Sequence, residues 1–120
     1  MPVEVAASGL AAKPDHVYIL PAGQEMRLAD GYFLLRPRSK VYGFTNVITI
    51  FLNSLSHSRH PGIAVILSGL DADGAAALGE FGEEGGIAIV QAPESATHPQ
   101  MPMSAIHTGR VDYILEPVTV

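Results

Sequence analysis

Residues 63–90 read IAVILSGLDADGAAALGEFGEEGGIAIV, and this stretch decides the fold. It begins with Ile63–Leu67, a run that is apolar at every position, as expected of a parallel strand covered on both faces. The segment Gly74–Glu84 has apolar residues at helical spacing and glutamates near the other side, and Gly85-Gly86 ends it. A second apolar run, Ile87–Val90, follows at once. Strand, helix and strand in this order predict a right-handed parallel β–α–β unit.

The flanking sequence adds further elements to this unit. Asp30-Gly31 lies between two runs rich in β-formers, which is a strong signal for a two-residue hairpin. Apolar residues recur at i, i+3, i+4 and i+7 from residue 48, which predicts a helix with Thr45 or Asn46 as candidate N-caps. The predicted elements are a strand at His16–Leu20, a peripheral hairpin at Met26–Ala29 and Tyr32–Arg36, a helix from Ile48 to about Ser56, a short helix at Met103–His107 and a strand at Tyr113–Leu115.

These elements predict the α/β class, with a parallel, doubly wound, Rossmann-like sheet and helices on both of its faces. The first fifteen residues supply no clear strand, so we expect the N-terminal side of the sheet to be incomplete. The composition, with 48% hydrophobic and 16% charged residues, is that of one globular unit. We therefore assign residues 1–120 to a single partial domain.

Composition also excludes several classes of function. The net charge is −5 and only Arg36, Arg38 and Lys40 cluster, so nucleic-acid binding is not expected. Cysteine is absent, which excludes disulfide and thiolate chemistry in this chain. The longest apolar run is far shorter than the roughly 20 residues of a membrane span, and the start of the chain does not resemble a secretory signal. We expect a cytoplasmic protein that inserts in no membrane.

The loop after residue 67, SGLDADG, is the richest in chemistry, because ligands and catalytic groups gather beyond the carboxyl ends of parallel strands. Asp71 and Asp73 lie there, and an aspartate just before a helix is most often an ordinary N-cap. A calcium loop is disfavoured because the twelve-residue spacing and its final glutamate are missing. Two carboxylates also make the turn a poor cradle for phosphate. No cofactor or metal is expected.

A catalytic triad assembled within this chain is also disfavoured. The G-x-S-x-G pattern of an exposed nucleophilic serine is missing, so we expect the hydroxyl of Ser68 to bond to backbone. His98 and His107 lie in the long loop region at the carboxyl edge of the sheet, where a catalytic role for either is the less favoured interpretation.

Several motifs, in order and spacing, resemble one family. These are HVYILPAGQEMRLADGYFLL (16–35), ITIFLNSLS (48–56), IAVILSGLDADGAAAL (63–78) and EEGGIAIVQAPESATHPQMPMSAIHTGRVDYIL (83–115). Together they are similar to the catalytic domain of the protein-glutamate methylesterases (CheB type) of bacterial chemotaxis. The resemblance extends over about residues 3–115.

The resemblance implies a Ser-His-Asp hydrolase that removes γ-methyl esters from glutamates on the cytoplasmic helices of chemoreceptors; some members also deamidate glutamine. The last acidic position of the family's G-x-G-x-D-G turn corresponds to Asp73, which would be the catalytic aspartate that orients a histidine. The loop Pro93–Ser104 matches a family stretch beside the same crevice. The implied oxyanion and substrate-pocket residues are Gly69, Leu70, Met101, Pro102 and Ser104.

The family's serine and histidine segments have no counterpart in this chain, so we expect a truncated product that is inactive as an esterase by itself. Asp71, Thr49 and Gln100 depart from the family pattern, which leaves open a divergent member. The alternative is a non-catalytic interaction or scaffold module derived from the same fold. Missing strands would leave an unpaired sheet edge, and we therefore expect a homodimer or a domain-swapped assembly.

Overall fold

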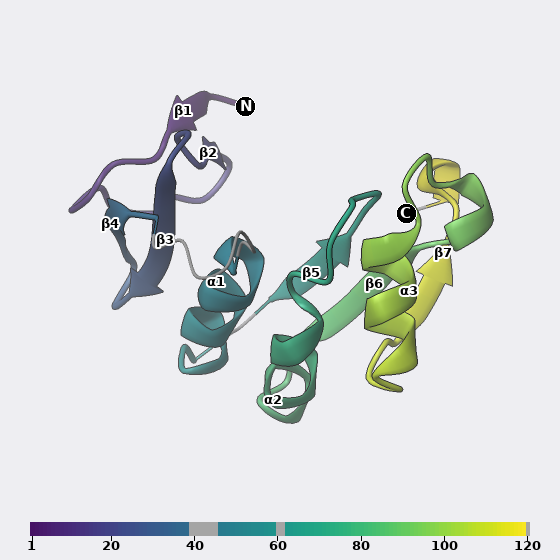
Figure 1. Ribbon diagram of the computed structural model, residues 1–120. Helices are drawn as coiled ribbons and strands as arrows, with labels where there is room; N and C mark the ends of the chain where they lie inside the picture. The colour runs from purple at the N-terminus through teal and green to yellow at the C-terminus, as the bar shows by residue number, and fades with distance from the viewer. Residues whose placement is uncertain (39–45, 60–61, 120) are drawn as a thin grey trace.

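The computed structural model describes residues 1–38, 46–59 and 62–119 (Figure 1). Its largest sheet is parallel, with strands β5 (Ile63–Ile66), β6 (Ile87–Gln91) and β7 (Tyr113–Leu115) in the order β5-β6-β7. Each strand aligns with its neighbour in register, so that Ile63 lies opposite Ile87 and Ile89 opposite Tyr113. The strands predicted at these three places, and the parallel α/β class, are confirmed.

Within the described ranges, three helices pack against this sheet: α1 (Val47–Ser56), α2 (Leu78–Glu83) and α3 (Gln100–His107). The segment predicted as one helix before residue 84 begins as a 3₁₀ turn, η1 (Ala75–Ala77), and continues as α2. Helix α3 begins three residues earlier than predicted. Pro102 is tolerated there because the first turn of a helix needs no N–H at that position. Two further 3₁₀ turns are η2 (Pro93–Ser95) and η3 (Pro117–Thr119).

The two faces of the sheet differ sharply. All three helices contribute to the core on one face, where side chains from β5 and β6 are buried together with Leu52, Leu78, Phe81 and Ala105. Figure 1 shows α2 and α3 on the same side of the strands. The residues described do not provide the second helical layer that the apolar strand sequences predicted. The bare face consists of Ile63, Val65, Leu67, Ile87 and Tyr113, which are 40–63% exposed.

The N-terminal region forms two small sheets beside α1. Strands β3 (Gln24–Ala29) and β4 (Tyr32–Pro37) make the predicted antiparallel hairpin. Asp30 and Gly31 have φ of 52° and 83°, the positive values that a type I′ turn requires at both central residues. The second sheet pairs β1 (Val3–Val5) with β2 (Val17–Ile19) in parallel.

Strand β1 is a correction to the sequence analysis, which found no strand before residue 16. Three residues are too few for a hydrophobic period, and this strand is fixed by pairing, with Val3 opposite Val17 and the Ala6 amide donating to the Ile19 carbonyl at 2.8 Å. Strand β2 is paired with β1 and not with the three-stranded sheet. Among the described residues, the outer edge of β5 therefore has no partner strand.

No helix in the described ranges is long and apolar enough to cross a membrane. The same residues contain no group of three or more histidine, aspartate or glutamate side chains placed to hold a metal ion.

Candidate active site

Asp73 lies seven residues after the end of β5, and its side chain connects this loop to the start of helix α1. The residue is 8% exposed. Its Oδ2 accepts a hydrogen bond from the Ile48 amide, and its Oδ1 accepts one from the Thr49 amide, both at 2.9 Å. These amides belong to the first turn of α1, where backbone N–H groups have no partner within the helix. The carboxylate thus lies at the positive end of the α1 dipole, a stabilising arrangement.

This contact corrects two predictions about helix caps. Asn46 is at the N-cap position of α1 but its side chain makes no capping bond, and Thr45 lies outside the described residues. The cap is supplied by Asp73, 25 residues away from Ile48 in the sequence. Asp73 was predicted to cap the helix that follows it, whereas Gly74 begins η1 without a side-chain cap. A local sequence pattern could not reveal a cap supplied by a distant segment.

The turn around Asp73 is closed by further hydrogen bonds. The Asp73 amide donates to Oδ1 of Asp71 at 2.9 Å, and the Gly74 amide donates to Oγ1 of Thr49 at 2.8 Å. Gly74 has φ of 94°, and a Cβ added there would lie 2.9 Å from Cγ2 of Ile48. The two amides are thus used inside the protein, which argues against the turn as an anion cradle.

A cavity of about 460 Å³ opens beside this turn, within the usual range for ligand sites. It lies between this turn and the N-terminal end of α1, since Asn46 and Thr49 also line it. A carboxylate can accept about four hydrogen bonds, and α1 uses one site on each oxygen. The lining residues are Asn46, Thr49, Ile50, Asp71, Ala72, Asp73 and Ala76.

The other residues implied by the resemblance lie around a second contact. The Gly69 amide donates to the His98 carbonyl at 2.9 Å, and the Met101 amide donates to the Gly69 carbonyl at 3.2 Å. A Cβ at position 69 would overlap the sulfur of Met101, so any other residue there would require the Met101 side chain to move. Pro102 is buried, and Leu70 is 70% exposed.

Gly69 and Met101 are therefore brought together, but neither they nor Leu70, Pro102 and Ser104 line the cavity beside Asp73. Their assignment to a substrate pocket stays a prediction.

Ser68 is used structurally, as predicted. Its hydroxyl accepts from the His98 amide at 2.9 Å and donates to the His98 carbonyl at 3.3 Å, so it faces backbone and not an imidazole. Sequence reasoning missed Gln91, a buried polar residue at the end of β6. Its Oε1 accepts from the Ser68 amide at 2.9 Å and its Nε2 donates to the Ser95 carbonyl at 3.1 Å. A polar residue directly after the apolar run IAIV was the available signal.

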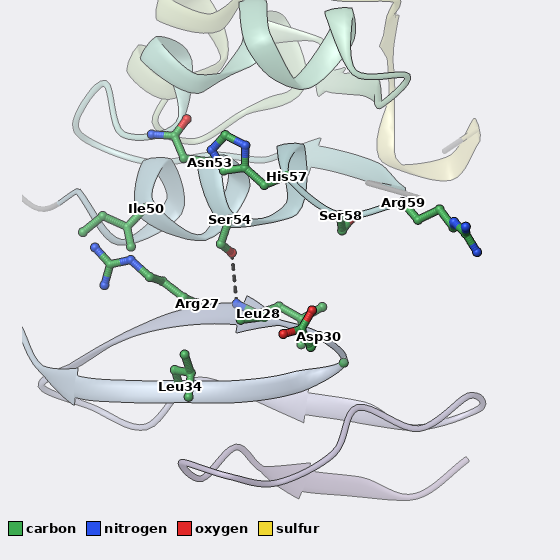
Figure 2. A pocket seen from close by; sticks show the side chains of 12 residues that line it. Arg27, Leu28, Asp30, Leu34, Ile50, Asn53, Ser54, His57, Ser58 and Arg59 are labelled. Atoms are coloured by element: carbon green, nitrogen blue, oxygen red, sulfur yellow. Dashed lines mark hydrogen bonds between the residues drawn. The ribbon is translucent and has the colours of Figure 1, made fainter.

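A larger cavity, of about 710 Å³, lies between the β3–β4 hairpin and α1 (Figure 2). Oγ of Ser54 accepts from the Leu28 amide at 3.0 Å and ties the two elements together. Arg27 and Arg59 lie toward opposite ends of the view in Figure 2. No residue of the turn 71–74 lines this cavity, and Ile50 is the lining residue that it shares with the cavity beside Asp73.

Comparisons with known proteins agree on one family. The family model described as CheB methylesterase matches residues 1–120. A protein-glutamate methylesterase/protein-glutamine glutaminase of Methanococcus maripaludis is 27% identical over 124 residues, covering 98% of this chain and 34% of the relative. An uncharacterised 104.1 kDa protein of Rhodobacter capsulatus is 30% identical over 115 residues, covering 96% of this chain and 12% of the relative.

A solved structure agrees with these relatives. The CheB methylesterase catalytic domain of Thermotoga maritima superposes with a TM-score of 0.78 at 29% identity, covering 93% of this chain and 62% of that domain. The chain thus spans about three fifths of the solved domain and about a third or less of these two curated relatives.

Proposed function

We propose that this chain, which belongs to the CheB methylesterase family, is the aspartate-bearing part of a protein-glutamate methylesterase domain. In this role Asp73 acts with a serine and a histidine supplied by a segment outside the chain. The observation that carries the proposal is the buried Asp73 carboxylate, held by two helix amides at the wall of a 460 Å³ cavity.

The proposed reaction is hydrolysis of glutamate γ-methyl esters on the cytoplasmic helices of chemoreceptors. The serine oxygen attacks the ester carbonyl, the histidine takes the serine proton, and that proton leaves with methanol. Water then hydrolyses the acyl-enzyme, which restores the glutamate carboxylate and the serine. Asp73 keeps the imidazole in the required tautomer and stabilises the imidazolium.

The geometry around Asp73 supports this role. A carboxylate that orients an imidazole must be rigid, and Asp73 has both oxygens anchored to the backbone of α1. It must also have acceptor sites left over, and Asp73, with one hydrogen bond from α1 on each oxygen, lines the adjoining cavity.

The isolated chain is expected to have no esterase activity. Ser68 is bound to the backbone of residue 98, and no serine of the described residues lines the cavity beside Asp73. Methanol release from methylated receptor by the 120-residue chain alone would contradict the proposal.

A chimeric domain provides the positive test. The part of the Thermotoga domain that this chain matches is replaced by residues 1–120, and folding is checked by circular dichroism before methanol release is measured. We expect activity in the chimera and a loss of about 10³-fold or more in Asp73→Asn, by analogy with the aspartate of serine proteases. Glu84→Gln makes the same carboxylate-to-amide change at an exposed residue that lines neither cavity, and this control should retain most of the activity. A folded chimera that releases no methanol, or one that tolerates Asp73→Asn, overturns the proposal.

We further propose that the chain acts in the cytoplasm and that, when alone, it forms a homodimer or a domain-swapped assembly. The support is the bare apolar face around Val65 together with the unpaired outer edge of β5. Exposed faces and edges of this kind drive association. Light scattering that finds only monomer at high concentration contradicts this part.

A non-catalytic interaction module is the second candidate, and the 710 Å³ cavity between the hairpin and α1 favours it. Arg27 and Arg59 both line this partly apolar cavity, and their positive charges suit an acidic helix of a receptor. In this case the chain alone should bind an acidic helical peptide, measured by fluorescence anisotropy. Arg27→Ala with Arg59→Ala should weaken that binding, whereas Asp73→Asn should not. Peptide binding that is indifferent to both arginines rejects this candidate.

A further inference from the structure

Thr49 and Asp73 hold each other's segments through reciprocal contacts. The Thr49 amide donates to Oδ1 of Asp73 at 2.9 Å, and the Thr49 hydroxyl accepts from the amide of Gly74, the next residue, at 2.8 Å. Each partner therefore satisfies a backbone N–H of the other segment. The arrangement has the logic of a capping box, except that it joins a helix to a loop about 25 residues away.

The bond from the Gly74 amide to the Thr49 hydroxyl limits how far the backbone of Asp73 can move. The bonds from the α1 amides to the Asp73 carboxylate do not by themselves fix the Asp73 backbone. Rotation about the side-chain bonds could keep the carboxylate on these amides while the backbone shifted. The bond from Gly74 to Thr49 removes this freedom by fixing the peptide that follows Asp73. Gly74 has little room to shift, since a Cβ there would approach Ile48 at 2.9 Å and Ile66 at 3.2 Å.

We propose that Thr49 is a positioning residue for Asp73, which fixes the carboxylate so that its unused acceptor sites face the 460 Å³ cavity. Thr49 itself lines that cavity but acts through Asp73, by holding the peptide between residues 73 and 74. The catalytic meaning of this role rests on the proposed function, whereas the conformational role does not.

The test is nuclear magnetic resonance on the full 120-residue chain. Thr49→Val keeps the shape of the side chain but removes the acceptor for the Gly74 amide. We expect hydrogen exchange at Gly74 to become about tenfold faster, and the χ1 couplings of Asp73 to change from one rotamer to an average. Thr49→Ser restores the hydroxyl and should bring exchange to within about threefold of the original chain.

Ser54→Ala is the matched control on the same helix. Its hydroxyl also accepts a backbone N–H from another segment, the Leu28 amide at 3.0 Å, but it does not contact Asp73. This variant should leave the Gly74 exchange and the Asp73 couplings unchanged. Thr49→Val with both readouts as in the original chain, or Ser54→Ala with the same effect on them, overturns the proposal. Should Thr49→Val fail to fold, the same readouts in Thr49→Ala decide the question.

The chimeric domain separates this proposal from the proposed function. There, Thr49→Val should lower kcat about tenfold or more with KM changed less than about threefold, because only the orientation of the catalytic aspartate is affected. A chimera without any activity counts against the proposed function, while the resonance measurements still decide whether Thr49 positions Asp73.

Discussion

The regions on either side of α1 are stabilised in different ways. The region after residue 62 shares with α1 a core of nine buried apolar residues, which includes Leu78 and Phe81 at 0% exposure. In the region before residue 38, the corresponding cluster has three buried members, Ala6, Met26 and Phe33. The C-terminal region has a core formed largely by its own strands and helices, whereas the small N-terminal cluster also packs against helix α1.

Helix α1 packs against both clusters. Leu52 is buried in the larger core, while Phe51 packs against the smaller cluster. Asp73 caps the same helix, so the candidate catalytic residue also joins the loop after β5 to the element that both regions share. We therefore expect disturbances at Asp73 to reach the N-terminal region.

The largest effect is expected from truncating the larger core. Phe81→Ala removes a fully buried ring and should lower the free energy of unfolding by about 3–5 kcal/mol, measured by urea denaturation. Phe33→Ala should act more locally and remove hydrogen-exchange protection from β3 and β4 while β5 and β6 stay protected. Equal loss of protection in all four strands would show that the two regions form one cooperative unit.

The next effect concerns the turn that joins the regions. Gly74→Ala combines positive φ with a contact of 2.9 Å to Ile48, so it should cost about 2–4 kcal/mol of unfolding free energy. Gly85→Ala has nearly the same φ, 97°, with open space around it, and should cost about 1 kcal/mol. Thermal or urea unfolding measures the loss in both variants. The loss in Gly85→Ala reports the cost of positive φ alone, and the additional loss in Gly74→Ala reports the steric cost of the contact with Ile48. Equal losses would mean that the approach of Ile48 to Gly74 is not restrictive.

A smaller effect is expected from removing the cap of α1. Asp73→Ala leaves the Ile48 and Thr49 amides without their acceptor and should cost about 1–2 kcal/mol. Faster hydrogen exchange at these two amides should accompany the loss. Asp71→Ala removes the acceptor of the Asp73 amide but leaves both α1 amides capped, so it should cost less. A larger loss of unfolding free energy in Asp71→Ala than in Asp73→Ala would mean that Asp71, and not Asp73, is the main link between the two regions.

The smallest effect on stability is expected on the bare face of the sheet. Val65→Thr is nearly isosteric at a residue 42% exposed, so it should change the unfolding free energy by less than about 0.5 kcal/mol while reducing self-association. Ile66→Thr, on the covered face at 2% exposure, should be clearly destabilising. Light scattering and urea denaturation measure the two properties. A strong destabilisation by Val65→Thr would mean that this face is covered.

Local patterns predicted the local elements. The hairpin followed from Asp30-Gly31, because few dipeptides adopt positive φ at both positions, and the strands of the main sheet followed from their apolar runs. Strand β1 was not predicted, because three residues are too few to show a hydrophobic period and the strand is defined only by its pairing with β2. The apolar sequence of β5 predicted cover on both faces, but the described helices all pack on one.

The sequence by itself determined the parallel α/β class, the family and the place of Asp73 after a buried strand. Apolar period, turn residues and motif spacing are properties of consecutive residues, which is why these could be read directly. Only the tertiary structure decided that Asp73 caps α1, that Thr49 holds the following peptide and that one face of the sheet is bare. Each of these depends on segments that are distant in the chain and meet through packing, and no local pattern records which segments will meet.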